Sequence, residues 1–347
     1  MISELISNRS VIVCCGSGGV GKTTMAASIG LAAATLGKRV VVITVDPARR
    51  LGDALGLEHG LGPDPARVAL PSGVSGELWA MMLDPAVELE RVIRTTAVRP
   101  GQADEALANP FTQSIATSLG GTQEYMATEA VYRLTTDEAF DLVVVDTPPS
   151  DRAMAVVEAP DVLVKFLDHQ VFKLLMGTGG RAARFLSAAT QPLVKAVGRV
   201  IGSNVLNDVV DFLRSFTGME TSFRQRAIAV QQIWRSESTA FVLVAAPTSE
   251  SLNEISRFND ELRSAGISST ALIANGATHD VNAERESPDQ VPEVAWQWLK
   301  WQSALAASER AVLDARESEL PDITMVSRLS EDVHDVDGLL TLATQLT

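Results

Sequence analysis

Apolar residues recur along the chain in two alternating patterns. Short runs rich in Val and Ile, several of them apolar throughout, are typical of strands buried on both faces. Longer segments between these runs repeat their apolar positions at helical spacing. The alternation predicts an α/β fold with a mostly parallel sheet flanked by helices. The expected strands are 10–15, 39–46, 77–83, 140–146, 239–246, 268–275 and 323–327, and the main helices are 22–36, 84–96, 123–135, 249–265, 293–315 and 331–346.

Two stretches interrupt this alternation. Residues 57–77 are rich in Gly and Pro and predict a loop or switch extension. Residues 153–236 contain no convincing strand and predict an all-helical insertion. We therefore expect one nucleotide-binding domain built from 1–152 and 237–347, with 153–236 as a helical insertion subdomain.

The insertion contains three segments with apolar residues at helical spacing. Such faces either line a groove that holds a hydrophobic client helix or pack on one another and on a partner subunit. The pattern leaves both readings open. The three segments of the insertion are 162–167, 171–176 and 205–213.

Late in the chain, the spacing of Trp296, Trp298 and Trp301 does not place all three on one face of a helix. This favours a role in bracing the helix over a platform on which a ligand stacks.

Composition and charge narrow the class of protein. Hydrophobic residues make up 46% of the 347 residues, enough for a large core. The formal charge of -14 argues against a nucleic-acid binder and against a basic membrane anchor. The start of the chain lacks signal-peptide features, and no uncharged apolar run reaches the ~18 residues of a membrane span. These features predict a cytoplasmic protein.

A glycine-rich loop supplies the strongest chemical signal. Residues 16–24 read Gly-Ser-Gly-Gly-Val-Gly-Lys-Thr-Thr, between an apolar strand and an apolar helix, and match the phosphate-binding loop pattern in its required context. This predicts a P-loop NTPase with ATP and Mg²⁺ as cofactors. Backbone N–H groups of the loop cradle phosphate oxygens, Lys22 reaches the β- and γ-phosphates, and the Thr23 hydroxyl is a Mg²⁺ ligand. The expected nucleotide-binding residues of the loop are Gly18, Gly19, Val20, Gly21, Lys22, Thr23 and Thr24.

Two carboxylates end apolar strands and fit the same chemistry. Asp146 closes the run 140–146 and is the expected Mg²⁺ partner. Asp46 closes the run 39–46, where it either orients or deprotonates the attacking water or caps the turn at Pro47. Because parallel strands end at one edge of a sheet, both carboxylates should lie near the phosphate loop.

These motifs together resemble one family. Gly-Gly-Val-Gly-Lys-Thr-Thr at 18–24, Val-Asp-Pro-Ala-Arg-Arg-Leu at 45–51 and Asp-Thr-Pro-Pro-Ser at 146–150 are similar to the deviant-Walker ATPases of the arsenite-pump and tail-anchored-protein-targeting family (ArsA/GET type). The order of the motifs and the helical insertion extend the resemblance over nearly the whole chain.

The resemblance implies a role for several residues and for the whole chain. It implies that Asp46 activates water in switch I, that Asp146 is the first residue of switch II, and that Asn275 contacts adenine. It also implies a dimer with nucleotides at its interface, in which ATP hydrolysis opens and closes a helical groove during client or membrane-protein handling.

One position departs from the family pattern. Family loops carry a signature lysine that reaches the partner's nucleotide, whereas this chain has Ser17 there, which cannot stabilise phosphate charge as an ammonium does. The chain therefore pairs with a sister ATPase that carries the lysine, uses an arginine such as Arg49, Arg50 or Arg152, or hydrolyses slowly as a switch. We favour the first reading, a heterodimer over a homodimer, because the chain most resembles bacterial paired members that lack the lysine. The alternative function is a weakly hydrolytic regulatory subunit.

The metal-binding chemistry of some family members is not expected here. Cys14 and Cys15 are adjacent in the first strand and point to opposite faces, which predicts buried, inert thiols. Arsenite cargo and a zinc-tied dimer are therefore disfavoured. The four histidines are scattered without ligand spacing and predict no metal site.

Overall fold

The computed structural model describes residues 1–46, 50–57, 60–110, 112, 121–137, 139–169, 211–212, 214–279, 281 and 292–347. Within them, the chain divides into two compact units. The sheet unit comprises Met1–Leu83, Leu134–Met154 and Arg235–Thr347, and the helical unit comprises Asp84–Arg133 and Ala155–Trp234. The expected boundaries differ from this division chiefly in residues 84–133, which group with the helices that follow the Asp146 strand.

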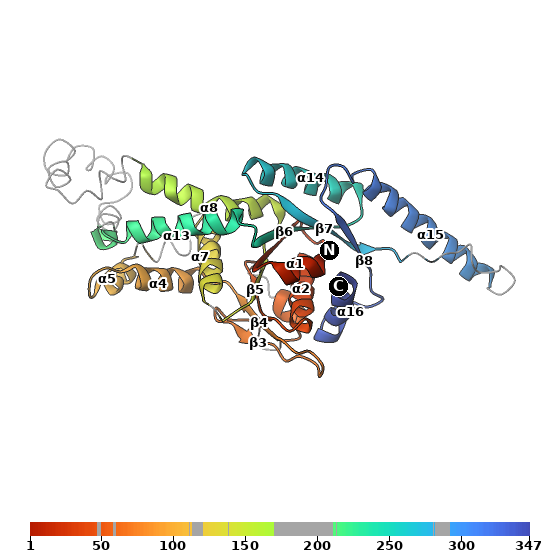
Figure 1. Cartoon of the computed structure of the whole chain (residues 1–347), viewed down its shortest axis with the longest axis horizontal. Helices are drawn as coiled ribbons and strands as arrows, with labels where there is room; N and C mark the ends of the chain where they lie inside the picture. Colours follow the sequence, from red (N-terminus) through yellow and green to blue (C-terminus); the bar gives the residue numbers. More distant parts are fainter. Residues whose placement is uncertain are drawn as a thin grey trace. The chain divides into compact units, whose positions relative to one another are not determined.

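The sheet unit contains eight strands in the order β3-β4-β2-β5-β1-β6-β7-β8 (Figure 1). All neighbouring strands are parallel except β3 and β4, so the predicted α/β fold is confirmed. The expected strands are all present, with ends that differ by a few residues. The bounds of the strands are β1 Val11–Gly16, β2 Arg39–Thr44, β3 Ala66–Arg67, β4 Glu77–Met82, β5 Leu142–Asp146, β6 Thr239–Ala245, β7 Ser269–Ala277 and β8 Ile323–Ser327.

Helices cover this sheet because its strands are apolar on both faces. Helix α2 (Lys22–Thr35) lies with α1 (Ile2–Asn8) and α16 (Val336–Leu346) on one face (Figure 1), over Ile12, Val42 and Val144. Helix α14 (Ser249–Ser264) contacts β6 and β7, and α15 (Glu293–Asp314) precedes β8. The short helix α3 spans Arg50–Ala54.

The structure corrects the expected start of the last helix and adds one short strand to the Gly- and Pro-rich segment. The last helix begins at Val336 and not at residue 331, because the Asp335 side chain accepts a hydrogen bond from the Gly338 N–H at 2.8 Å and caps it there. The described part of 57–77 is largely irregular, as expected, except for the two-residue strand β3, which pairs with β4 at the sheet edge. The apolar pattern also did not predict α1, α3 or α5 (Gln102–Ala108).

The helical unit contains α4 (Pro85–Thr96), α5 (Gln102–Ala108), α13 (Glu220–Arg235) and most of α7 (Thr122–Thr136) and α8 (Ser150–Asp168). In the first predicted amphipathic segment, Val162 and Phe166 are exposed and Leu167 is buried. The segments 171–176 and, except for residues 211–212, 205–213 lie outside the described residues. The described part therefore leaves both readings of these segments open.

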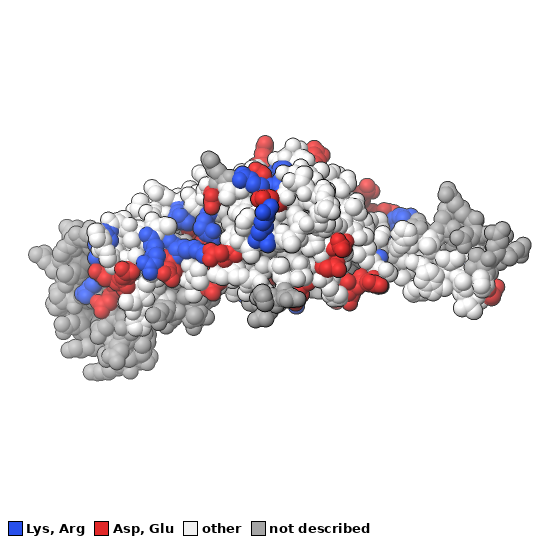
Figure 2. Space-filling view, turned by 90° about the horizontal axis from the view of Figure 1, so that it is seen from below, with Lys and Arg blue, Asp and Glu red and all other residues white. Residues whose placement is uncertain are grey.

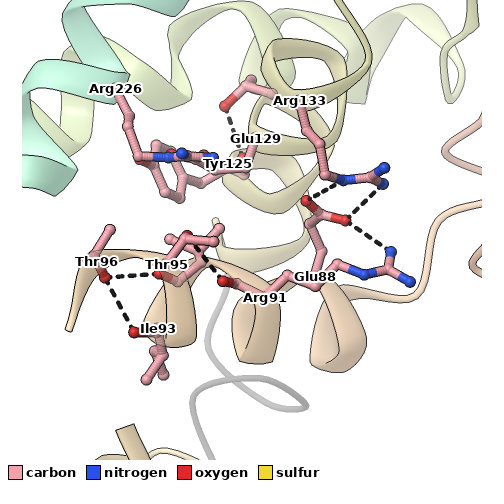
Figure 3. A network of polar contacts seen from close by, with 11 residues as sticks. Glu88, Arg91, Ile93, Thr95, Thr96, Tyr125, Glu129, Arg133 and Arg226 are labelled. Carbon is pink, nitrogen blue, oxygen red and sulfur yellow. Dashed lines mark hydrogen bonds and ion pairs between the residues drawn. The ribbon is translucent and has the colours of Figure 1, made fainter. Parts of the chain in front are cut away.

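Two buried carboxylates hold helices of this unit together (Figure 3). Glu88 of α4 is 1% exposed and accepts two hydrogen bonds of 3.1 Å from the Arg133 guanidinium of α7. Glu129 of α7 is fully buried and accepts a 2.6 Å hydrogen bond from Arg226 of α13 and another from the Tyr125 hydroxyl. Burial raises the pKa of Glu129, while Arg226 and Tyr125 lower it. Each charge is thus paired where it is removed from water.

Candidate nucleotide site

Three neighbouring strands end at one edge of the sheet and bring the predicted site residues together. Strand β5 lies between β1 and β2, and its last residue, Asp146, is in register with Cys14 of β1 and Thr44 of β2. The phosphate loop follows β1 directly, and Asp46 follows β2. The carboxyl ends of parallel strands are where open α/β sheets bind ligands. The structure thus gathers at this edge residues that lie more than 120 positions apart along the chain.

The phosphate loop turns into α2 through Gly21. This residue has φ +88°, in the left-handed region that favours glycine, and a Cβ there would lie 2.3 Å from Asn275 Nδ2. The N-cap residue, Gly21, has no side chain to accept from the first N–H groups of α2, and such groups at a helix start can bind an anion. Gly18 and Gly19 are exposed, Val20 and Thr24 are half-buried, and a Cβ at Gly18 or Gly19 would meet no atom within 4 Å.

Lys22 is buried at 8% exposure in the first turn of α2. Its Nζ donates a 2.6 Å hydrogen bond to the Ser17 carbonyl, which holds the ammonium against its own loop. Burial lowers the pKa of Lys22, and the nearby Asp146, Cys15 and Asp46 raise it. This hydrogen bond to the backbone of the phosphate loop holds the Lys22 ammonium where it can contact phosphate oxygens.

Asp146 is fully buried beside two hydroxyls. Its Oδ2 accepts 2.8 Å hydrogen bonds from Thr23 Oγ1 and Thr44 Oγ1. Its Oδ1 is also buried and has no hydrogen-bond partner among the described residues. Burial raises the pKa of Asp146 from 3.8 to about 6, although both hydroxyls and Lys22 lower it. A buried oxygen with an open coordination position, next to a threonine hydroxyl, fits the oxygen ligands that Mg²⁺ prefers.

Asp46 lies at the same edge with a partly exposed side chain. Its Oδ2 is 3.8 Å from Nη1 of Arg50, which lies in the first turn of α3. Of the three arginines considered as replacements for the signature lysine, Arg50 is therefore next to the site. Arg49 lies outside the described residues, and Arg152 lies in the first turn of α8.

Asn275 also contacts the phosphate loop. It lies in β7, two strands away from β1, and its Nδ2 donates a 2.8 Å hydrogen bond to the Val20 carbonyl. This contact fixes the loop immediately before Gly21. Asn275 is thus at the site, where it braces the loop.

Two contacts near the site were not predicted from the sequence, although each includes a residue of a recognised motif. Ser17 is 5% exposed, and its hydroxyl lies 3.4 Å from that of Ser251 in the first turn of α14. One turn further along α14, Glu254 accepts a 2.6 Å hydrogen bond from the Ser150 hydroxyl, at the start of α8. Ser17 and Ser150 belong to motifs, but their partners Ser251 and Glu254 lie more than 100 residues away and follow no motif. Thr44, two positions before Asp46, was likewise not predicted as a partner of Asp146.

The two cysteines are fully buried, as predicted. Burial raises the pKa of Cys15 to about 12 and that of Cys14 well above its ordinary value, which keeps both thiols protonated and unreactive. The described part of the chain holds no group of three or more His, Cys, Asp or Glu side chains that could bind a metal ion.

Comparison with known proteins identifies the family. The family model for anion-transporting ATPases matches residues 9–302. The chain belongs to this family. It is 30% identical to the ATPase GET3 of Malassezia globosa over 277 residues, which are 79% of this chain and 75% of that protein. It is 28% identical to an arsenical pump-driving ATPase of Acidiphilium multivorum over 317 residues, 90% of this chain. The Escherichia coli arsenical pump-driving ATPase is 27% identical over 84% of this chain.

The two arsenical pump proteins are much longer than the part that this chain matches. The chain covers 45% and 42% of their lengths. Membership of the family supports ATP binding and ATP hydrolysis, and the chain is an ATPase. Among the described residues, we find no helix with the length and hydropathy that crossing a bilayer requires.

Proposed function

We propose that this family member is a Mg²⁺-dependent, dimeric cytoplasmic ATPase that acts as a nucleotide-driven conformational switch in client or membrane-protein handling. The single observation that carries the proposal is the convergence of Lys22, Thr23, Asp146 and Asp46 at the edge where the phosphate loop opens α2. Bound Mg²⁺ would neutralise developing charge on the phosphates.

Each residue has a stated role in this proposal. The N–H groups from Gly18 to Thr24 bind phosphate oxygens, and Lys22 contacts the β- and γ-phosphates. Thr23 and Asp146 would hold Mg²⁺, and the Oδ1 of Asp146, which has no hydrogen-bond partner among the described residues, is free to contribute to that site. Asp46 positions the attacking water and accepts its proton. Asn275 braces the loop and contacts adenine, as its counterpart does in the family resemblance.

We further propose that the chain works with a related ATPase that carries the signature lysine. Ser17 supports this, because its hydroxyl is buried against Ser251 and carries no charge that could reach a second nucleotide. The same observation favours the alternative function, a weakly hydrolytic regulatory subunit of such a pair. A hydrophobic client helix is one possible cargo of the helical unit, the alternative being that its apolar faces pack on one another or on the partner; Val162 and Phe166, exposed on α8, would contact such a helix.

Two measurements test the proposal. Replacing the general base, Asp46→Asn, should lower ATP turnover by roughly 10²–10⁴-fold with little change in ATP affinity. The control is Asp53→Asn, an exposed carboxylate on the same segment, which should retain turnover. Equal turnover of both variants would remove Asp46 from the mechanism, and failure of the unaltered chain to bind ATP would overturn the site itself.

The partner is tested separately, by the turnover of the purified chain alone. Slow hydrolysis that rises when a lysine-bearing relative is added supports the pair. Brisk hydrolysis by the single chain contradicts an obligate partner. Slow hydrolysis by the pair as well as by the chain alone would favour the regulatory alternative.

A further inference from the structure

Helix α15 exposes large apolar side chains from its first turn to just beyond its middle. Val294 is 80% exposed, Trp298 56%, Trp301 62% and Leu305 36%. They are four of the nine large apolar side chains that are exposed among the described residues. We call these four residues the α15 seam. Such a concentration on one helix marks an interaction surface more strongly than scattered apolar residues do.

The two halves of α15 differ in how they are held. The C-terminal half is anchored, because Leu313 is buried and Glu309 accepts hydrogen bonds of 2.7 and 2.9 Å from the backbone N–H and hydroxyl of Thr278. The only buried side chains of the helix, Ala306 and Leu313, lie in this half. Figure 1 shows the other end of α15 extending away from the sheet. The C-terminal end of α15 is therefore packed against the sheet unit, while the face that carries the seam is exposed to solvent.

The spacing of the seam is that of a coiled coil. Its residues follow one another at intervals of four, three and four, the a and d positions of two heptads. At 3.6 residues per turn they occupy a strip only ~60° wide. Lys300, whose Nζ lies 5.0 Å from the centroid of the Trp296 ring, is on the opposite side of the helix. As expected, the three tryptophans do not share one face; Trp298 and Trp301 do, together with Val294 and Leu305.

The flanks of the seam carry no charge. The residues at the e and g positions decide which helices can pair, because like charges there repel. Here these positions are Ala295, Gln297, Gln302 and Ala304. Although the chain has a net charge of -14, and both acidic and basic side chains lie on the face that Figure 2 shows, the positions that would flank a helix pair along the seam therefore add no like-charge repulsion.

We propose that α15 pairs with α15 of a second copy of this chain as an antiparallel two-helix contact. The seam is symmetric about the point between residues 299 and 300, so a two-fold axis there places each Trp298 against Trp301 of the other copy. Val294 then faces Leu305 of the other copy. The antiparallel direction is favoured because it sets the two acidic sheet units at opposite ends of the contact, whereas a parallel pair would bring them together.

The surface available limits the strength of this contact. At roughly 200 Å² per indole, the exposed fractions of Trp298 and Trp301 supply about 470 Å² over two copies. The aliphatic pairs add to this, but the total stays below the ~1,200 Å² of a stable interface. We therefore expect a weak association that depends on concentration. It uses none of the proposed nucleotide-site residues, so it goes beyond the proposed function and leaves those sites available to a sister chain.

Sedimentation velocity over a concentration series, without nucleotide, tests the contact. The unaltered chain should shift from monomer to dimer as its concentration rises, and W298E or W301E should remove this shift. W296E is the matched control, since it makes the same exchange on the opposite side of the helix and should retain the shift. Circular dichroism and ATP binding verify that each variant is folded. A chain that is monomeric throughout, or a dimer that W298E leaves intact, would overturn the proposal.

Disulfide formation tests the direction of the pair. Because Cys14 and Cys15 are buried, an added surface cysteine is the thiol that reacts. In the antiparallel arrangement, a mixture of W298C and W301C should form a disulfide between the two variants faster than either variant forms one with itself. Faster homodisulfides would contradict the arrangement. Neither result depends on ATP turnover, so this test and that of the proposed function can fail separately.

Discussion

Replacing Asp146 with asparagine should make the nucleotide-free, metal-free protein more stable near pH 8. The carboxyl is fully buried, and burial raises its pKa from 3.8 to about 6. Below about pH 4 the group is protonated in both the folded and the unfolded chain. Between about pH 4 and 6 the unfolded chain releases the proton and the folded chain retains it, so stability falls as pH rises. A shift of about two units corresponds to a loss of about 3 kcal/mol, complete above the folded pKa.

Asparagine resembles the protonated carboxyl and does not ionise. The Thr23 and Thr44 hydroxyls can still donate to its oxygen, and the position of Oδ1 remains unpartnered among the described residues in both proteins. We therefore expect Asp146→Asn to raise the free energy of unfolding by about 2–3 kcal/mol at pH 8, and to change it little at pH 4.

The assay is urea unfolding followed by circular dichroism, in EDTA and without nucleotide, at both pH values. Asp46→Asn is the control, because Asp46 is partly exposed and pairs with an exposed Arg50; it should change stability by less than ~1 kcal/mol. The reasoning is refuted if Asp146→Asn is no more stable than the unaltered protein at pH 8, or equally stabilised at both pH values. Asp146→Asn should also lose Mg²⁺-dependent ATP turnover. That result would show that the Asp146 carboxylate lowers stability but is needed for activity.

Two further substitutions test contacts that hold each unit together. Glu88→Ala leaves the partly buried Arg133 without its carboxylate and should lower the free energy of unfolding by roughly 3–5 kcal/mol, measured by urea unfolding. The control, Glu90→Ala, removes an exposed ion pair on the same helix and should lower it by less than ~1 kcal/mol. Equal losses would contradict a role for burial. Asn275→Ala removes the hydrogen bond to the Val20 carbonyl and should weaken ATP binding by up to about tenfold in calorimetry, and unchanged affinity would show that the loop is held without it.

The local sequence predicts much of the sheet unit because its signals are local. Apolar strands such as 11–16 and 142–146 are buried on both faces, so their residues read as continuous apolar runs. The phosphate loop was equally recognisable, since phosphate binding needs glycines, a lysine and a threonine at fixed spacing. The placement of Asp146 beside Thr23 followed from the rule that parallel strands end at one edge.

The helical part was harder to predict. Residues 84–133 group with the later helices through buried pairs such as Glu88–Arg133 and Glu129–Arg226. The first joins residues 45 positions apart and the second residues 97 apart. A charged residue on an amphipathic helix is usually solvated, and nothing in its immediate neighbours distinguishes one that folding will bury.

By itself, the sequence determined the fold class and the family, and it predicted the nucleotide-site residues, because short-range spacing encodes backbone geometry and phosphate chemistry. Only the tertiary structure decided that Ser17 is buried against Ser251, that one oxygen of Asp146 has no partner in the described part of the chain, and that Trp298 and Trp301 remain exposed. Burial and pairing depend on which distant segments meet. The same tryptophans at helical spacing would read identically whether they filled a core or, as here, formed the open side of a helix.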